Sequence, residues 1–438
     1  MAGEVERLKA QTVVIGSGPG GATVARELAR RGKEVLVLEE GAYHKPVGSW
    51  LTMLKMLDHM GNFASIEGTQ MVRLLTVGGS TVSFCGVAYQ PPAWLKDRHG
   101  IDIQPYLDEI NAELDIKPMP ESLIGGGSRR IMAAAQEEGL DWKPLPHFLD
   151  ASKCDLSCPK CMIGCAKGAK WTAREFVEEA TAAGVRLKTQ AKADDVLFDG
   201  GRVTGVRGTG KTGPFLVEAE RVVVAGGGLG TPMLLQASGL EDAGRNGFFI
   251  DPLQLTTGIP AKGPGSHKDI PMTCGTLEMQ DEGIIMTDVI DPWPLYYFGM
   301  VMGGPRKAKF YTGFPRTLGI MTKSRDALTG SIMPDGKVSK PLGSPELDLL
   351  AKGREIATRV LVRAGCAPDS ILSAPPRGAH PGGTVRIDDF LDRDLQTPIA
   401  GLYVCDSSVI PEPMGLPPVM MILGLAKRLV NETLEKGA

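Results

Sequence analysis

The chain has 438 residues, 42% of them hydrophobic and 23% charged, with a formal net charge of −3. This length suits two or three domains at roughly 150 residues each, and the balanced charge excludes the basic surface that nucleic-acid binding requires. No apolar run reaches the ~18 residues of a membrane-spanning helix, and MAGEVERLKA lacks the apolar core of a signal peptide. We therefore expect a cytoplasmic protein with no transmembrane segment and no nucleic-acid partner.

The segment QTVVIGSGPGGATVARELARRGKEVLVLEEG predicts a strand, a glycine turn, a helix and a second strand. Residues 12–15 and 35–38 are apolar, as buried parallel strands are, and the helix between them ends at Gly32. In such a unit, glycines permit a tight turn, close approach of the backbone to a pyrophosphate and close packing of helix on strand, while a carboxylate binds ribose hydroxyls. The residues in these four roles are Gly16, Gly18, Gly21 and Glu39. The segment therefore predicts a dinucleotide-binding site.

Further glycine turns follow along the chain. GGSTV at residues 78–82 forms a second turn, suited to wrapping a pyrophosphate and a ring edge. DDVLFDGGRVTGV predicts a β-hairpin that turns at Gly200 and Gly201. ERVVVAGGGLGTPMLLQASGL predicts a strand and a glycine turn that lead into a helix, and GLYVCDSSVIPEP predicts a strand that ends in Asp406.

Half of the eight cysteines lie within the short run KCDLSCPKCMIGCAK. Disulfides are the least expected use of these thiols in a chain without an export signal. The run is too compact for the two separated CxxC pairs of a zinc ribbon. It is as compact as ferredoxin motifs, although its first gap is three residues rather than two. We expect an iron–sulfur cluster, four-iron rather than three-iron, with zinc or free redox thiols as alternatives. Its ligands would be Cys154, Cys158, Cys161 and Cys165.

Residues 255–375 predict strands joined by turns, followed by an amphipathic helix capped by Ser344 and ended by Gly365. The run DPWPLYYFGM, at residues 291–300, is dense in aromatic side chains. Such a run either lines an apolar pocket or belongs to ordinary core.

In this order, GSGPGG, VGGST, AGGGLGTP and the strand ending at Asp406 resemble the glucose–methanol–choline (GMC) family of FAD oxidoreductases. The resemblance implies an α/β fold, in which a Rossmann-like FAD-binding domain, discontinuous in sequence, carries a β-rich α+β substrate domain. The FAD-binding domain would comprise residues 1–144, 173–254 and 376–438. A cysteine-rich cluster-binding segment would comprise 145–172, and the substrate domain 255–375. With no histidine near Gly79 to tether the flavin, we expect non-covalent FAD.

The resemblance also implies roles for single residues. His380, in GAHPGGTVRI, would be the catalytic base, because an imidazole with a pKa near 7 suits removal of a hydroxyl proton. The family usually places a second His or Asn in the last loop, where this chain has Pro417 and Pro418, and Phe84 stands where relatives often carry Asn. The expected cofactor-binding residues are Gly16, Gly18, Gly21, Glu39, Gly78, Gly79, Ser80, Thr81, Ala193, Gly226, Asp406 and Pro417.

We therefore expect an FAD-dependent dehydrogenase that oxidises a CH–OH group of a small-molecule alcohol. Hydride would pass to FAD, and electrons would leave through the iron–sulfur cluster to an external acceptor, either a protein or a quinone. The enzyme could act in a homo- or hetero-oligomer. The alternatives are a reductase fed through the cluster and a non-catalytic electron-transfer flavoprotein subunit.

Overall fold

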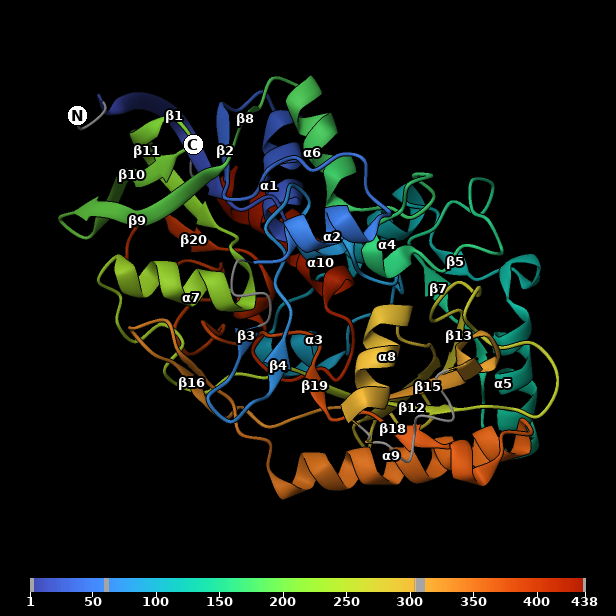
Figure 1. Cartoon of the computed structure of the whole chain (residues 1–438). Helices are drawn as coiled ribbons and strands as arrows, with labels where there is room; N and C mark the ends of the chain where they lie inside the picture. Colours follow the sequence, from blue (N-terminus) through green and yellow to red (C-terminus); the bar gives the residue numbers. More distant parts are fainter. Residues whose placement is uncertain (1–3, 59–62, 303, 305–311, 436–438) are drawn as a thin grey trace.

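The computed structural model describes residues 4–58, 63–302, 304 and 312–435. Among these residues, two seven-stranded sheets organise the chain (Figure 1). In the described part, every helix is too short or too polar to cross a lipid bilayer.

The first sheet has the strand order β8–β2–β1–β11–β10–β9, and β20 also pairs with β11. The pairings among β8, β2, β1, β11 and β20 are parallel, whereas β10 pairs antiparallel with β11 and β9. β2, which lies between β8 and β1, is buried along its whole length, as parallel strands covered on both faces are. The strands are β1 Glu6–Ile15, β2 Val35–Glu39, β8 Arg186–Thr189, β9 Ala191–Asp199, β10 Arg202–Gly210, β11 Gly213–Val224 and β20 Leu402–Val404.

Helices cover this sheet. α1 packs against both α6 and α10, while α7 packs against β9, and Figure 1 shows α7 apart from the other three. These four helices are α1 Pro19–Ala29, α6 Ala173–Ala182, α7 Gly227–Ala237 and α10 Val419–Arg428. The prediction of an α/β fold with a Rossmann-like domain is confirmed.

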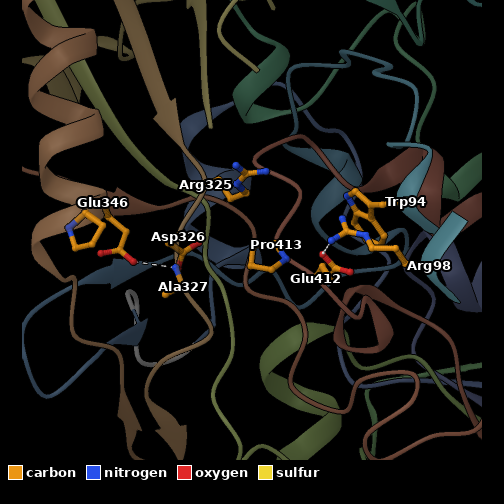
Figure 2. Close-up of a pocket in the computed structure, with 9 residues that line it drawn as sticks. Trp94, Arg98, Arg325, Asp326, Ala327, Glu346, Glu412 and Pro413 are labelled. Carbon is orange, nitrogen blue, oxygen red and sulfur yellow. Dashed lines mark hydrogen bonds and ion pairs between the residues drawn. The ribbon is translucent and has the colours of Figure 1, made fainter. Parts of the chain in front are cut away.

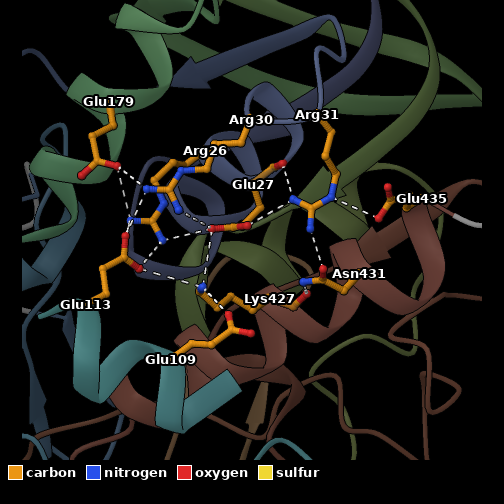
Figure 3. A network of polar contacts seen from close by, with 10 residues as sticks. All are labelled: Arg26, Glu27, Arg30, Arg31, Glu109, Glu113, Glu179, Lys427, Asn431 and Glu435. Carbon is orange, nitrogen blue, oxygen red and sulfur yellow. Dashed lines mark hydrogen bonds and ion pairs between the residues drawn. The ribbon is translucent and has the colours of Figure 1, made fainter. Parts of the chain in front are cut away.

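A network of ion pairs ties α1 to its neighbours (Figure 3). Arg26 is 1% exposed and bonds to Glu113 of α4, at 2.8 and 3.0 Å. Its guanidinium also lies 3.3 Å from the ring centroid of Phe176 on α6. Lys427 of α10 donates to Glu109 of α4 at 2.8 Å. Because these charges are paired, their burial between helices is tolerated, and the network fixes the helices around α1.

The second sheet is antiparallel and has the order β18–β12–β15–β14–β13–β6, with β19 also paired to β12. Ile284, Met286 and Ile320 join one hydrophobic cluster with residues of α5 and α9, whereas Leu255, Ile285 and Met321 join the cluster of the first sheet. One face of this sheet therefore turns toward the nucleotide-binding domain. The strands are β6 Lys143–Pro144, β12 Pro252–Gly258, β13 Cys274–Thr276, β14 Ile284–Asp288, β15 Leu318–Ser324, β18 Leu372–Ser373 and β19 Arg377–Gly378.

The helix predicted near residue 344 is α9, Ser344–Arg363. Ser344 is its first residue rather than its cap, because Gly343 occupies the N-cap position and makes no side-chain capping bond. The remaining helices are α2 Trp50–Met56, α3 Trp94–His99, α4 Gln104–Glu113, α5 Gly126–Glu137 and α8 Trp293–Met302. The remaining strands are β3 Phe63–Ala64, β4 Gln70–Met71, β5 Lys117–Pro118, β7 Pro146–His147, β16 Ser331–Ile332 and β17 Val338–Ser339.

Asp288, the last residue of β14, is a buried carboxyl that gives the fold a pH dependence. It is 2% exposed, and it accepts hydrogen bonds from Thr273 Oγ1 at 3.0 Å and from the amide of Cys274 at 2.7 Å. Burial raises the pKa of Asp288 to about 7. An unfolded aspartate has a pKa of about 3.9. The folded protein therefore keeps a proton that the unfolded chain releases, and stability falls as pH rises from about 4 to about 7.

Replacing Asp288 by asparagine is expected to remove the part of the pH slope that Asp288 contributes. That part lowers the free energy of unfolding by up to about 4 kcal/mol between pH 4 and pH 8, since each pKa unit is worth about 1.4 kcal/mol. The free energy of unfolding of Asp288→Asn, measured by denaturant titration, should fall by less over that range. Asp141→Asn, at an exposed position, serves as the control. An unchanged slope in Asp288→Asn would mean that another group carries the pH dependence.

Candidate active site

The glycine turn between β1 and α1 combines two tightly packed glycines with one open one. Gly16 has φ +101°, and a Cβ there would lie 2.2 Å from the carbonyl oxygen of Ala225. A Cβ on Gly21 would lie 2.1 Å from the oxygen of Gly16. A Cβ on Gly18 meets nothing within 4 Å, and α1 begins there without a side-chain cap. The turn thus leaves open space in front of a helix N-terminus, which fits the pyrophosphate of a dinucleotide.

Glu39 lies at the end of β2 and faces this turn. It is 6% exposed, and it accepts hydrogen bonds from the amide of Ser17 at 3.0 Å and its hydroxyl at 2.6 Å. Burial raises the pKa of Glu39. The amide of Gln190 bonds to the oxygen of Gly41 at 3.1 Å, which brings the start of β9, with the half-buried Ala193, beside the end of β2.

The second glycine turn lies directly against the first. The amide of Gly78 donates to Ser17 Oγ at 3.1 Å, and a Cβ on Gly79 would lie 3.0 Å from the Cα of Gly18. Thr81 is buried and fixes the turn, since its hydroxyl donates to the oxygen of Gly78 at 2.6 Å and accepts from the amide of Ala173 at 2.9 Å. Ser80 is exposed. Residues that are more than sixty positions apart in sequence therefore line one cleft.

Asp406 closes the cleft from the C-terminal side. It is 5% exposed, and it accepts from the amide of Gly227 at 2.8 Å and from Thr231 Oγ1 at 2.5 Å. Burial raises the pKa of Asp406. Gly226 precedes α7 at this point, and Pro417 is half-buried just before α10. The two glycine turns and Glu39 thus lie together, Asp406 lies at the start of α7, and the open Gly18 and the uncapped α1 fit a bound dinucleotide such as FAD.

His380, which is half-buried, belongs to a cluster with the buried Asp251 and Lys323. Its Nδ1 lies 2.6 Å from Nζ of Lys323 and 3.3 Å from Oδ2 of Asp251. Lys323 and Asp251 form an ion pair of 2.9 Å, with side chains 1% and 0% exposed. Burial and the neighbouring Lys323 lower the pKa of His380 to about 4, so the imidazole is neutral at physiological pH. The prediction of a pKa near 7 overlooked this environment.

Asp251 joins several elements at this cluster. Its other oxygen accepts from the amide of Gly415, in the last loop, at 3.1 Å. Its φ of +48° is in the left-handed region, which non-glycine residues rarely occupy and which is typical of functional sites. The backbone of the His380 segment lies against α7, because a Cβ on Gly228 would be 2.0 Å from the oxygen of Pro381. The cluster therefore lies where the nucleotide-binding domain meets the second sheet.

A second buried ion pair supports the first. Lys340 and Asp326 are 2.9 Å apart, with side chains 0% and 1% exposed. Asp326 accepts hydrogen bonds from the amides of Ile250 and Asp251, at 3.1 and 2.9 Å. Asp326 thereby holds the backbone that carries the Asp251 carboxylate.

Sequence reasoning identified His380 but missed Asp251 and Lys323. Lys323 is the one charged residue of the otherwise uncharged strand β15, LGIMTKS. A lone lysine in such a strand is a usable signal, since lysine is almost never fully buried unless it is paired. Nothing local in FFIDPLQL distinguishes Asp251 from a surface aspartate, so only the fold identifies its partner.

The four cysteines of residues 154–165 lie on an irregular segment next to the Gly78–Thr81 turn. Lys170, which is 1% exposed, joins the two, because its Nζ donates to the oxygens of Cys161 (2.9 Å), Val82 (3.1 Å) and Phe84. Cys161 is buried, whereas Cys154, Cys158 and Cys165 are half-buried. Burial raises the pKa of Cys161 to about 12 and that of Cys154 to about 11.

In the described part of the chain, no group of three or more His, Cys, Asp or Glu side chains is arranged to hold a metal ion. The arrangement therefore does not fit the predicted ligand set of Cys154, Cys158, Cys161 and Cys165. Cys161 is buried in one hydrophobic cluster and Cys154 packs against the same cluster, whereas Cys158 and Cys165 are half-buried outside it. Local spacing alone led to the metal prediction, and tertiary packing gives it no support.

Two cavities lie outside the His380 cluster, since none of His380, Asp251 and Lys323 lines either of them. One, of about 440 Å³, is lined by charged residues from both domains; Figure 2 shows Arg98 reaching Glu412 at one end and Glu346 bonded to Ala327 at the other. The other cavity, of about 430 Å³, is mainly apolar. Its lining includes Trp50, Met162, Ile163, Ile290, Trp293 and Phe314.

The apolar cavity connects with the His380 segment through Asp291. This lining residue forms a two-bond ion pair with Arg377, at 3.0 and 2.5 Å, and Arg377 lies three positions before His380. Of the aromatic run 291–300, Asp291, Pro292 and Trp293 line the cavity, whereas the side chains of residues 298–300 lie outside the described part.

Comparisons with known proteins give matches over most of the chain. Residues 55–251 match the family model described as GMC oxidoreductase, and residues 14–44 match that of an NAD(P)-binding Rossmann-like domain. An uncharacterized protein of Methanocaldococcus jannaschii is 28% identical over 96% of this chain and 99% of its own length. A long-chain-alcohol oxidase of Arabidopsis thaliana is 26% identical over 96% of this chain and 67% of its own length.

A solved structure shares the fold. Pyridoxine 4-oxidase from Mesorbium loti superposes with a TM-score of 0.69 at 14% identity, covering 97% of this chain and 99% of that one. An uncharacterized GMC-type oxidoreductase of Mycobacterium tuberculosis is 27% identical over 98% of this chain and 76% of its own length. The chain is therefore similar to GMC oxidoreductases over residues 55–251 and to NAD(P)-binding Rossmann-like domains over residues 14–44.

Proposed function

We propose that the protein is an FAD-dependent oxidoreductase that oxidises a CH–OH group, with His380 as the residue that handles the hydroxyl proton. The observation that carries the proposal is the position of His380 on a segment whose backbone packs against the α7 glycine turn of the nucleotide cleft. In alcohol oxidation by hydride transfer, a positioned base removes the hydroxyl proton. Bound FAD would supply the hydride acceptor.

The apolar cavity supports a substrate with an apolar body. Its lining offers Trp50, Ile163 and Ile290 among other apolar side chains, and Asp291 connects it with the His380 segment. A relative named as a long-chain-alcohol oxidase agrees with an alcohol of this kind. We therefore propose an apolar alcohol as the substrate. Anaerobic mixing with 1-hexanol, 1-dodecanol and benzyl alcohol tests this, because bleaching of the flavin absorbance reports oxidation. No bleaching by any of the three would contradict the proposal and favour a reductase or an electron-transfer subunit.

A pair of glycine variants tests the cofactor. Gly18→Ala should leave the fold intact, since its Cβ meets open space, but should lower FAD affinity about tenfold or more by obstructing the pyrophosphate. Acid precipitation of the wild type should release FAD, identified by mass, because the binding is non-covalent. Gly20→Ala is the matched contrast: its Cβ would lie 1.8 Å from the oxygen of Cys405, so the fold itself should fail. Unchanged FAD affinity in Gly18→Ala would place the pyrophosphate elsewhere.

We further propose that electrons leave to an external protein or quinone, as in a dehydrogenase. It is supported by the closeness of the cysteine segment to the Gly78–Thr81 turn, although the arrangement of the thiols does not fit a cluster. If the cysteines bind iron, protein purified without oxygen should contain about four iron and four sulfide per chain. Cys158→Ser should then lower the iron content and the sulfide content while FAD stays bound. Iron-free, sulfide-free protein that consumes dioxygen would identify an oxidase without a cluster.

A further inference from the structure

Lys323 occupies an unusual place for a lysine. It lies near the end of β15, an inner strand of the second sheet, with Leu253 of β12 and Ile285 of β14 as its cross-strand neighbours. Its side chain is 1% exposed. The Nζ atom has two close polar partners there, Oδ2 of Asp251 at 2.9 Å and Nδ1 of His380 at 2.6 Å. A buried ammonium needs such partners, and here one of them is the proposed base.

This contact restricts which nitrogen of His380 carries hydrogen. Nδ1 lies 2.6 Å from Lys323 and 3.3 Å from the Asp251 carboxylate, so the contact with Lys323 is the closer one. An ammonium only donates hydrogen bonds, so while Lys323 is charged this contact requires Nδ1 to be an acceptor without hydrogen. Neutral imidazole carries a single hydrogen, which then resides on Nε2. In that tautomer the free side of the ring offers a hydrogen to a substrate oxygen and cannot take one.

We propose that Lys323 is the positioning residue that sets the tautomer of His380 and receives, through its ring, the proton of the substrate hydroxyl. The proposal rests on the function proposed above. It gives the chain the second proton-handling group that Pro417 and Pro418, in the last loop, do not provide.

The proton transfer balances as follows. When Lys323 is neutral, Nδ1–H of His380 donates to its Nζ, and Nε2 presents a lone pair. The substrate O–H bond breaks and its proton bonds to Nε2, while the Nδ1 proton moves to Lys323. Bound FAD would supply the oxidant that takes the hydride from the same carbon, so that the alcohol becomes a carbonyl. The resulting ammonium is again paired with Asp251. When Lys323 starts as an ammonium, this transfer is blocked.

The charges around the cluster define the pH dependence. Asp251 and His380 face Lys323 directly, and Asp326, itself paired with Lys340, acts on both Lys323 and Asp251. Burial lowers the pKa of Lys323 from its usual value of 10.5. Alcohol oxidation should therefore speed up as pH rises through the pKa of Lys323, because the neutral lysine is the competent form.

Nitrogen-15 NMR of the FAD-loaded protein, labelled at histidine, tests the proposal without any substrate. At pH 7, His380 should show hydrogen on Nε2 and none on Nδ1, with its signals assigned by His380→Gln. His147 is an internal control of the opposite kind, since its Nδ1 lies 2.8 Å from the carbonyl oxygen of Leu145 and must carry the hydrogen. In Lys323→Met, the hydrogen of His380 should move to Nδ1, where Asp251 can accept it.

If Lys323→Met does not fold, a pH titration of the wild type alone still tests the proposal. Raising the pH through the ionisation of Lys323 should move the His380 hydrogen from Nε2 to Nδ1, whereas the hydrogen of His147 should stay on Nδ1. Hydrogen on Nδ1 of wild-type His380 at pH 7, or a tautomer that does not respond to pH, would overturn the proposal. Failure of the proposed function would instead appear as absence of FAD or of flavin reduction, which the NMR signals do not measure.

Discussion

Replacing His380 by alanine is expected to slow anaerobic reduction of the bound flavin by an alcohol about 10²–10⁴-fold, the usual contribution of a positioned base. Substrate affinity should change far less, because the proton moves mainly in the transition state. Stopped-flow absorbance at several alcohol concentrations separates the two effects. Because the pKa of His380 is lowered to about 4, protonation of this ring should not reduce the wild-type rate between pH 6 and pH 8.

His99→Ala is a suitable control for this variant. His99 contacts Asp388 and Glu412, at 2.8 and 3.0 Å, and neither belongs to the His380 cluster. Its replacement should change the reduction rate only a few-fold. Near-normal reduction in His380→Ala would show that the hydroxyl proton leaves by another route.

The nucleotide-binding unit was largely predictable because its determinants are local. Apolar strands, glycines and a terminal carboxylate follow one another within thirty residues, and the structure gives β1, α1 and β2 in that order. The prediction missed the first part of β1, from Glu6 to Ala10. These residues look like a polar surface segment, but they pair in register with Phe215–Ala219 of β11, a partner that is about two hundred residues away.

The proton-handling cluster was only partly predictable. His380 is found through a motif, whereas Asp251 and Lys323 meet it only because three separate strands and the last loop converge. For the cysteine run, the structure does not support the cluster that the sequence predicts. Its spacing favours a ligand set, yet the fold buries Cys161 beside Lys170 and leaves Cys158 nearer the surface. The cysteine spacing shows which ligand sets a loop could form, whereas tertiary packing determines which side chains lie close together.

Removing one partner of the buried ion pair Lys340–Asp326 should strongly destabilise the folded state. Lys340→Met leaves the buried carboxylate of Asp326 without its cation, and removing one partner of a buried pair typically costs about 3–5 kcal/mol. Lys340 Nζ also donates to the oxygens of Phe248 and Ala327, at 2.6 and 2.9 Å, which would lose this donor. Urea denaturation of the FAD-free protein at pH 8 should show the loss directly.

The pH dependence of this variant follows from the carboxyl. Burial already raises the pKa of Asp326 to about 6 with Lys340 in place, and loss of the cation must raise it further. A raised folded pKa means that stability falls as pH rises from about 4, the unfolded value, to the folded pKa. Lys340→Met should therefore be much less destabilised at pH 5, where Asp326 is protonated, than at pH 8. The double variant Lys340→Met/Asp326→Asn, which buries no charge, should recover part of the loss at pH 8 and show little slope. Equal destabilisation of the single variant at both pH values would mean that the lost carbonyl contacts, rather than the unpaired carboxylate, determine the cost.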